Sequence, residues 1–172
     1  MLTLILFRHA KSSWDEEAMK DFDRPLSERG IAAAPVIGGY MARSGLMPDL
    51  VLSSPSVRTR ETSMLAFEAC QPPPEIRFED ALYLASPKTM LGRIRRVESG
   101  VRRLMLLGHN PGLQALALDL AGDGPKDLIA ELSTNLPTAG LVVIEFDAKT
   151  WADVEPGSGR FRLFVTPRKL AA

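Results

Sequence analysis

The feature that most restricts the fold of this chain is a series of short, unbroken apolar runs. Four of them are rich in Leu, Ile and Val without polar alternation: Leu2–Phe7, Asp49–Ser53, Arg103–Leu107 and Leu141–Phe146. Such runs are typical of strands that helices cover on both faces in a parallel sheet. A fifth run, Arg160–Thr166, alternates between polar and apolar residues and indicates an edge strand.

The segments between these runs begin with helix start signals. Three of them place an N-cap residue directly before a proline: Ser54-Pro55, Ser86-Pro87 and Asn110-Pro111. Gly100 and Gly122 stand where glycines that end helices are expected. A further helix is expected after Ser27, with a kink or an interruption at Pro35 because proline has no N–H to donate.

Strands that alternate with helices predict a three-layer α/β/α sandwich with a mostly parallel sheet and an antiparallel edge strand. No repeat, composition shift or flexible linker divides residues 1–172, so we expect a single domain. The chain has 21 Lys and Arg against 21 Asp and Glu, and this zero net charge argues against a nucleic acid partner.

The expected compartment follows from two further features. Cys70 is the only cysteine, which excludes an internal disulfide and fits a reducing compartment. No apolar stretch approaches the roughly 20 residues that cross a bilayer, and the N-terminus lacks the pattern of a secretory signal. We therefore expect a cytoplasmic protein with no membrane partner.

The residues that follow the predicted strands carry the chemistry. In an open α/β sheet, ligands bind outside the carboxyl ends of the strands. Arg8 and His9 follow the first run, Arg58 lies one helical turn beyond the second, and His109 follows the third. His9 and His109 are the only histidines of the chain. The sequence therefore predicts two imidazoles and two guanidiniums at one rim of the sheet.

This set suits phosphoryl transfer. Arginines can donate paired hydrogen bonds to one phosphate and stabilise the charge that spreads over its oxygens. A neutral imidazole can attack phosphorus, and neighbouring arginines are expected to lower its pKa and keep it unprotonated. His9 is the predicted nucleophile. A single histidine at a strand end is more often structural, but here separate segments agree.

Other phosphate chemistries lack their residues. A cysteine phosphatase needs an arginine at a spacing from its thiolate where Cys70 has Ile76. The Asp21-Phe22-Asp23 segment does not follow a buried strand, as the motif of an aspartyl phosphatase would. No P-loop motif is present. Two histidines without a nearby Cys or carboxylate cluster make a weak metal site, so neither a metal nor a cofactor is expected.

Four ordered motifs resemble those of the histidine phosphatase (phosphoglycerate mutase-like) superfamily, and in particular its SixA branch of phosphohistidine phosphatases. The motifs are Arg8-His9-Ala10-Lys11-Ser12-Ser13-Trp14-Asp15, Arg24-Pro25-Leu26-Ser27-Glu28-Arg29-Gly30, Ser53-Ser54-Pro55-Ser56-Val57-Arg58 and Gly108-His109-Asn110-Pro111-Gly112. Leu82-Tyr83-Leu84-Ala85 and Phe164-Val165-Thr166-Pro167 also fit the pattern, so the resemblance covers nearly the whole chain.

The resemblance implies a phosphoglycerate mutase-like fold and a nucleophilic His9, with Arg8, Arg58 and His109 completing a phosphate pocket. It further implies a phosphohistidine intermediate that water hydrolyses without a metal. Ala10 departs from the usual Arg-His-Gly signature, so the backbone there should avoid a glycine-only conformation.

A second departure concerns the general acid. The superfamily places a glutamate after the second strand and helix, and here the match is off register. The candidates are Glu79, Asp80 and Asp23, each of which could equally be a solvated loop residue. An oxygen leaving group needs a proton donor, whereas the imidazole released from phosphohistidine is less basic. The uncertain acid therefore favours phosphoramidate substrates over phosphate monoesters.

These observations leave three functions open. The favoured one is a metal-independent phosphatase that removes phosphate from phosphohistidine on a partner protein and releases inorganic phosphate. A short chain with little room for a lid agrees with a substrate of protein size. The alternatives are a broad phosphomonoesterase acting on small phosphorylated substrates, and a binding module that recognises phosphorylated partners without cleaving them.

Overall fold

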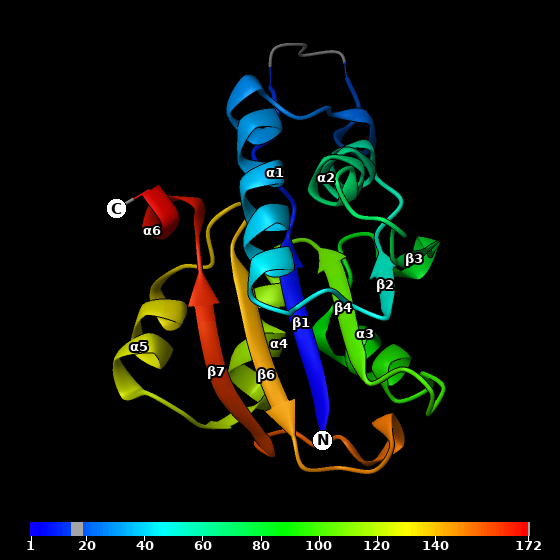
Figure 1. Cartoon of the computed structure of the whole chain (residues 1–172), viewed down its shortest axis with the longest axis vertical. Helices are drawn as coiled ribbons and strands as arrows, with labels where there is room; N and C mark the ends of the chain where they lie inside the picture. Colours follow the sequence, from blue (N-terminus) through cyan, green and yellow to red (C-terminus); the bar gives the residue numbers. More distant parts are fainter. Residues whose placement is uncertain (15–18, 172) are drawn as a thin grey trace.

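The computed structural model describes residues 1–14 and 19–171, so Asp15 of the first motif lies outside the described residues. Its core is one sheet of seven strands in the order β3-β2-β4-β1-β6-β7-β5 (Figure 1). The strands are β1 Leu2–Arg8, β2 Leu50–Ser53, β3 Glu75–Phe78, β4 Arg103–Gly108, β5 Ala121–Asp123, β6 Leu141–Phe146 and β7 Gly159–Val165.

Helices cover both faces of this sheet. They are α1 Glu28–Arg43, α2 Val57–Phe67, α3 Pro87–Ile94, α4 Gly112–Leu120, α5 Lys126–Thr134 and α6 Pro167–Ala171. In Figure 1, α1 lies in front of the sheet and α4 behind it. The predicted α/β/α sandwich with a mostly parallel sheet is confirmed. No helix in the described part of the chain is both long and apolar enough to cross a membrane.

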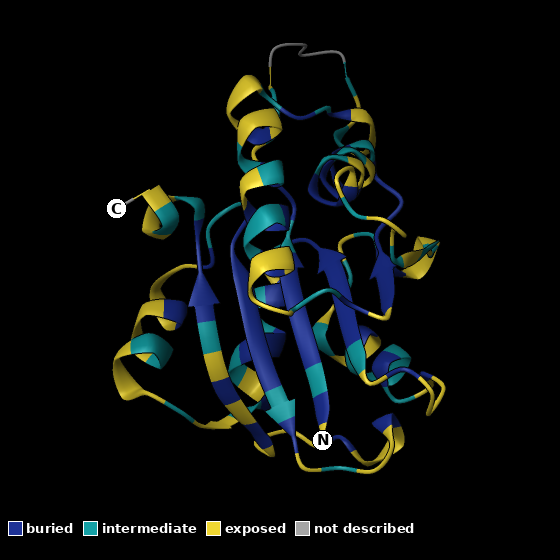
Figure 2. Cartoon of the chain, in the orientation of Figure 1, coloured by how far each residue is buried: buried dark blue, intermediate teal, exposed yellow. Residues whose placement is uncertain are grey.

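The central strand β1 shows why an unbroken apolar run builds this sandwich. Leu4 and Leu6 are fully buried in the cluster that includes residues of α3 and α4. Ile5 and Phe7 point the other way, into the cluster that includes residues of α1 and α2. Successive side chains of a strand face opposite sides, so a strand covered twice needs apolar residues at every position. Figure 2 shows this burial along the central strands.

The antiparallel strand is not at the edge that the sequence predicted. It is β6, which lies inside the sheet between β1 and β7 and runs antiparallel to both. Its approach explains its direction. The Ala139 N–H donates to the His9 carbonyl, so the chain enters β6 at the rim where β1 ends and can only run back.

The edges of the sheet differ from the prediction for a related reason. β7 matches the expected Arg160–Thr166 run, but β5 pairs with its outer side and takes the edge position. β3 forms the opposite edge. Neither edge strand was predicted, because β5 has only three residues and the four residues of β3, Glu-Ile-Arg-Phe, form no unbroken apolar run.

Helix starts are only partly as predicted. Ser86 caps α3 with Pro87 at its first turn, as expected. Ser56 rather than Ser54 caps α2, accepting a hydrogen bond from the Thr59 N–H, because the Ser54 hydroxyl is engaged elsewhere. α4 begins only at Gly112, and the Asn110 side chain accepts from the Gln114 N–H.

Helix ends were predicted less well. Gly100 lies beyond the end of α3, and Gly122 lies in β5, so neither ends a helix. Gly45, with φ of +67°, instead follows the end of α1. α1 continues through Pro35 without interruption, since proline removes one donor but leaves the remaining hydrogen bonds of a long helix in place.

Gly30 lets the first turn of α1 touch the segment after β1. A Cβ there would lie 2.1 Å from the Lys11 carbonyl oxygen. We expect Gly30→Ala to lower the free energy of unfolding by about 2–3 kcal/mol, because two backbones must separate.

Gly39→Ala on the same helix is the control, because the atom nearest to a Cβ at Gly39 is the flexible end of the Arg43 side chain at 3.1 Å. The control should be neutral or stabilising by up to about 1 kcal/mol. Urea denaturation of both variants tests this difference, and equal losses would contradict it.

Candidate active site

The strand register brings the predicted residues to one rim. Arg8 at the end of β1 pairs with Gly108 at the end of β4, so His9 and His109 follow at the same level. Their ring centroids are 5.3 Å apart. Arg58 is the second residue of α2. All four side chains line one cavity of about 410 Å³, so the expected convergence is present in the structure.

Hydrogen bonds fix the tautomer of His9. Its Nδ1 lies 2.7 Å from the Ala10 carbonyl oxygen, which can only accept, so Nδ1 carries the proton. The lone pair of the neutral ring is therefore on Nε2. The Ala10 N–H donates to Thr62 Oγ1 at 3.0 Å, which ties the residue after His9 to α2. The side chain of His9 is held in one orientation with an unprotonated nitrogen available.

His109 has the opposite tautomer. Its Nδ1 accepts from Arg58 Nη2 at 3.1 Å, because a guanidinium can only donate. Its Nε2 then carries the proton and donates to Ser54 Oγ at 2.7 Å. The two imidazoles thus differ in function, since one offers a free lone pair and the other is anchored at both nitrogens.

The two arginines have donors left over. Arg8 Nη1 donates to the Leu136 carbonyl at 2.9 Å. Arg58 donates to the carbonyl and the carboxylate of Asp21 at 2.8 and 3.1 Å. The buried Nε of each guanidinium has no hydrogen-bond partner among the residues that the structure describes. Both guanidinium groups line the same cavity, and their charge and N–H donors make that cavity suited to an anion.

Burial keeps both imidazoles neutral. Burial lowers the pKa of His9 to about 3, helped by the charges of His109, Arg58 and Arg8 and opposed by the bond to Ala10. Burial also lowers the pKa of His109 to about 4, with Arg58 and Arg8 acting in the same direction against Asp21. This direction was predicted from the neighbouring arginines, but burial contributes more to the lowered pKa values.

These lowered values make stability depend on pH. Between pH 6.5 and about 4, the unfolded chain binds protons at both histidines while the folded protein does not, so acid favours unfolding. We expect His9 alone to contribute a loss of about 1–2 kcal/mol in the free energy of unfolding between pH 6.5 and 5. Urea denaturation at both pH values measures this, with His9→Gln as the comparison. The variant should lose less stability than the wild type, and an equal loss would refute the assignment.

Asp21 lines the cavity and was not among the site residues predicted from the sequence. Its carboxylate accepts from Tyr83, from Arg58 and from Arg24, the last at 3.0 Å. Burial acts to raise the pKa of Asp21, but these bonds outweigh it and hold the pKa at about 2. Asp21 is therefore ionised at neutral pH. It lies in a short 3₁₀ helix, Asp21–Asp23, where no hydrophobic period marks the position.

The three predicted acids lie elsewhere. Glu79 forms a two-bond ion pair with Arg93, at 2.7 and 3.0 Å. Asp80 and Asp23 are exposed. None of the three lines the cavity; among the residues that the structure describes, Asp21 is the one carboxylate that does. Residues 1–14 and 19–171 contain no group of three or more His, Cys, Asp or Glu arranged to hold a metal ion.

Comparison with known proteins identifies the family of the chain. The model of the histidine phosphatase superfamily (branch 1) matches residues 4–83. An uncharacterised protein of Mycobacterium tuberculosis is 39% identical over 163 residues, covering 94% of this chain and 99% of that protein. The chain therefore belongs to the histidine phosphatase superfamily.

Its similarity within the superfamily is to SixA proteins. A candidate phosphohistidine phosphatase SixA from Agrobacterium tumefaciens is 33% identical, with a TM-score of 0.82 over 96% of this chain and 98% of that chain. A protein histidine phosphatase SixA in complex with tungstate shares the fold, with a TM-score of 0.79 over 98% and 99% of the two chains and 19% identity.

Proposed function

We propose that this protein is a metal-independent phosphatase that hydrolyses phosphohistidine on a partner protein. The observation that carries the proposal is the pairing of a neutral His9, whose Nε2 lone pair is free, with Arg8, Arg58 and His109 in one cavity. A nucleophile and cations placed together are what transfer of a phosphoryl group requires.

The first step forms an enzyme-bound phosphohistidine. The phosphoryl group of the substrate occupies the cavity, where Arg8 and Arg58 stabilise its oxygens. His9 Nε2 forms a bond to phosphorus as the bond from phosphorus to the substrate imidazole breaks. The substrate ring carries a proton from solvent on its other nitrogen, so the departing group keeps the electron pair of the broken bond and leaves as neutral imidazole.

The second step returns the enzyme to its starting state. A water oxygen attacks the phosphorus, the bond to His9 Nε2 breaks, and inorganic phosphate leaves. The Ala10 carbonyl holds the proton on Nδ1 throughout, so His9 leaves phosphorus as a neutral imidazole. Asp21 acts in both steps as a positioning residue, because it holds the Arg58 guanidinium at 3.1 Å.

The favoured leaving group follows from the protonation state of the one carboxylate that lines the described part of the cavity. A positioned acid is needed most by alkoxide leaving groups, and the carboxylate of the described cavity, Asp21, is held ionised by Tyr83, Arg24 and Arg58. An imidazole leaves without such help more readily than an alkoxide.

The rim of the cavity favours a substrate of protein size, because Trp14 and Leu84 line the cavity with 75% and 54% of their surfaces exposed.

Turnover in the presence of EDTA tests the proposal. Wild-type protein is mixed with a phosphohistidine-bearing protein, free phosphohistidine and a nitrophenyl phosphate ester, and release of inorganic phosphate is measured. We expect fast release from the phosphohistidine substrates and slow release from the ester. Faster turnover of the ester would favour the phosphomonoesterase, and binding without release, even in a single turnover, would favour the binding module.

A further inference from the structure

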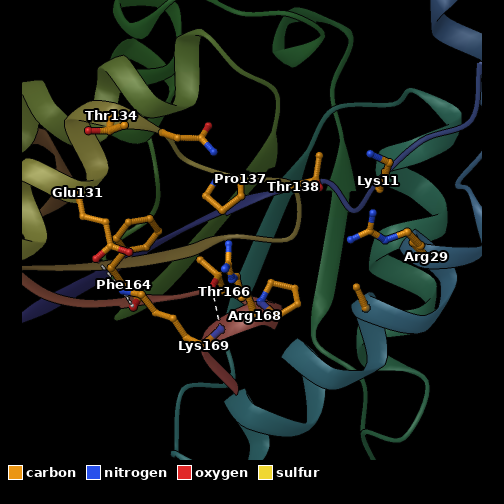
Figure 3. A pocket seen from close by; sticks show the side chains of 13 residues that line it. Lys11, Arg29, Glu131, Thr134, Pro137, Thr138, Phe164, Thr166, Arg168 and Lys169 are labelled. Atoms are coloured by element: carbon orange, nitrogen blue, oxygen red, sulfur yellow. Dashed lines mark hydrogen bonds and ion pairs between the residues drawn. The ribbon is translucent and has the colours of Figure 1, made fainter. Parts of the chain in front are cut away.

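A second and larger cavity adjoins the catalytic one. It has a volume of about 740 Å³, against about 410 Å³ for the catalytic cavity. Lys11 and Thr138 line both, so the two form neighbouring parts of one surface. Figure 3 shows its lining side chains, which come from the segment after β1, from α1, α5, α6 and β7, and from the loop before β6.

Three cations of this second cavity have no counter-ion among the residues that the structure describes. Lys11, Arg29 and Arg168 form no ion pair within the described part of the chain, and all three are exposed. In Figure 3, Lys11 and Arg29 lie on one side of the cavity and Glu131 lies on the opposite side. Arg168 lies between these two sides. The free positive charge thus begins beside the catalytic cavity and extends away from it.

Backbone contacts hold the near side in place. The Ser27 N–H donates to the Lys11 carbonyl at 2.9 Å, and Gly30 permits the close approach of the two backbones. Lys11 and Arg29 are therefore held beside each other although they belong to different segments. This arrangement accounts for Ser27, Arg29 and Gly30 of the Arg24–Gly30 motif, none of which lines the catalytic cavity.

The far side is neutralised internally. Lys169 Nζ pairs with Glu131 at 3.0 Å and lies 4.5 Å from the centre of the Phe164 ring. Pro137, Pro167 and the largely buried Phe164 add apolar surface to the wall. The cavity therefore combines spaced cations at its catalytic end with apolar surface farther out.

We propose that this cavity binds an acidic segment of the partner protein next to its phosphohistidine, with Lys11, Arg29 and Arg168 pairing with Asp or Glu side chains. This proposal rests on the proposed function and names the substrate class more closely. Charge complementarity identifies the occupant: cations on separate elements suit carboxylates spaced along a peptide, whereas a single phosphate is bound by converging donors. The apolar wall can accept the aliphatic parts of such a segment.

The loop between the two cavities links them. The Leu136 carbonyl accepts from Arg8 Nη1 and from the Asn110 side chain, both at 2.9 Å. The next two residues, Pro137 and Thr138, line the second cavity. A peptide seated there would lie against the same loop that positions Arg8, with its phosphohistidine directed into the catalytic cavity.

The test compares three substrates with wild-type protein and with Arg29→Gln/Arg168→Gln. The substrates are a phosphohistidine peptide with Asp and Glu flanks, the same peptide with Asn and Gln flanks, and free phosphohistidine. We expect the double variant to lose about tenfold in kcat/KM for the acidic peptide, mostly through KM, and to hydrolyse the other two within about twofold of wild type. The preference of the wild type for acidic flanks should weaken as salt is raised.

Arg43→Gln/Lys88→Gln is the matched control, since it removes the same charge from exposed residues that line neither cavity. It should behave as wild type. Equal hydrolysis of acidic and neutral peptides by wild-type protein would overturn the inference while leaving the proposed function intact. A loss in the double variant confined to small phosphorylated compounds would also overturn it. If no substrate is turned over, the proposed function fails. Tighter binding of the acidic peptide than of the neutral peptide by wild-type protein would then still support the inference, and equal binding would overturn it.

Discussion

Replacing His9 by alanine is expected to reduce kcat/KM for a phosphohistidine substrate by about 10⁴-fold or more, because no other described group offers a free imidazole lone pair to phosphorus. His109 cannot take over this part, since its Nε2 donates to Ser54 and its Nδ1 accepts from Arg58. Steady-state release of inorganic phosphate measures the loss.

A control separates chemistry from folding. Cys70→Ala changes a half-buried side chain beside Met47, outside the catalytic cavity, and should keep wild-type turnover. Circular dichroism and thermal unfolding of His9→Ala show whether the fold is retained. Activity of a folded His9→Ala protein within about tenfold of wild type would mean that water attacks the substrate directly and that His9 only binds phosphate.

Replacing Arg58 by alanine should cost about 10³-fold in kcat/KM, the second largest effect that we expect. This guanidinium contacts Asp21 and the Nδ1 of His109, and it lines the cavity with 3% of its surface exposed. Its removal takes a cation from the phosphoryl group and a donor from His109. Arg58→Lys should recover only part of the loss, because an ammonium cannot present the planar fork of donors.

Arg60 provides the comparison on the same helix. Its guanidinium lies 4.1 Å from the centre of the Phe78 ring and donates to the Pro55 carbonyl, and the residue does not line the catalytic cavity. Arg60→Ala should therefore retain kcat/KM to within about threefold of wild type. If Arg58→Ala and Arg60→Ala fell together, loss of structure in α2 rather than loss of a phosphate ligand would explain the result.

The convergence at the rim was predictable because it depends on strand ends. Unbroken apolar runs mark β1, β2 and β4, and parallel neighbours bring their carboxyl ends to one edge. His9 and His109 each stand directly after such a run, so their positions followed from the runs alone. Arg58 followed in the same way, since α2 begins shortly after β2.

The rest of the site depends on contacts that leave no period in the sequence. Asp21 comes from an irregular segment and reaches Arg58 and Tyr83 only through the folded chain. The Ser54 hydroxyl looked like a helix cap, but it binds His109 instead. In both cases a short polar side chain had several possible partners, and the tertiary structure selected one.

The sheet also has features that the sequence predicts and features that it does not. The direction of β6 could not be read from its residues, since an apolar run covered on both faces looks the same in parallel and antiparallel pairing. Its direction is set by the loop that ties Ala139 and Gly140 to His9 and Arg8. The antiparallel direction of β6 is thus a consequence of the backbone hydrogen bonds between this loop and the end of β1.

The most direct test of the account is to trap the phosphorylated enzyme and locate the phosphoryl group. Wild-type protein is mixed with ³²P-labelled phosphohistidine substrate, quenched within milliseconds in base, and mapped by proteolysis and mass spectrometry. We expect a single label on His9, bound at Nε2, because Nδ1 is held by the Ala10 carbonyl at 2.7 Å. A label on His109, or rapid phosphate release with no labelled histidine at any time, would contradict it.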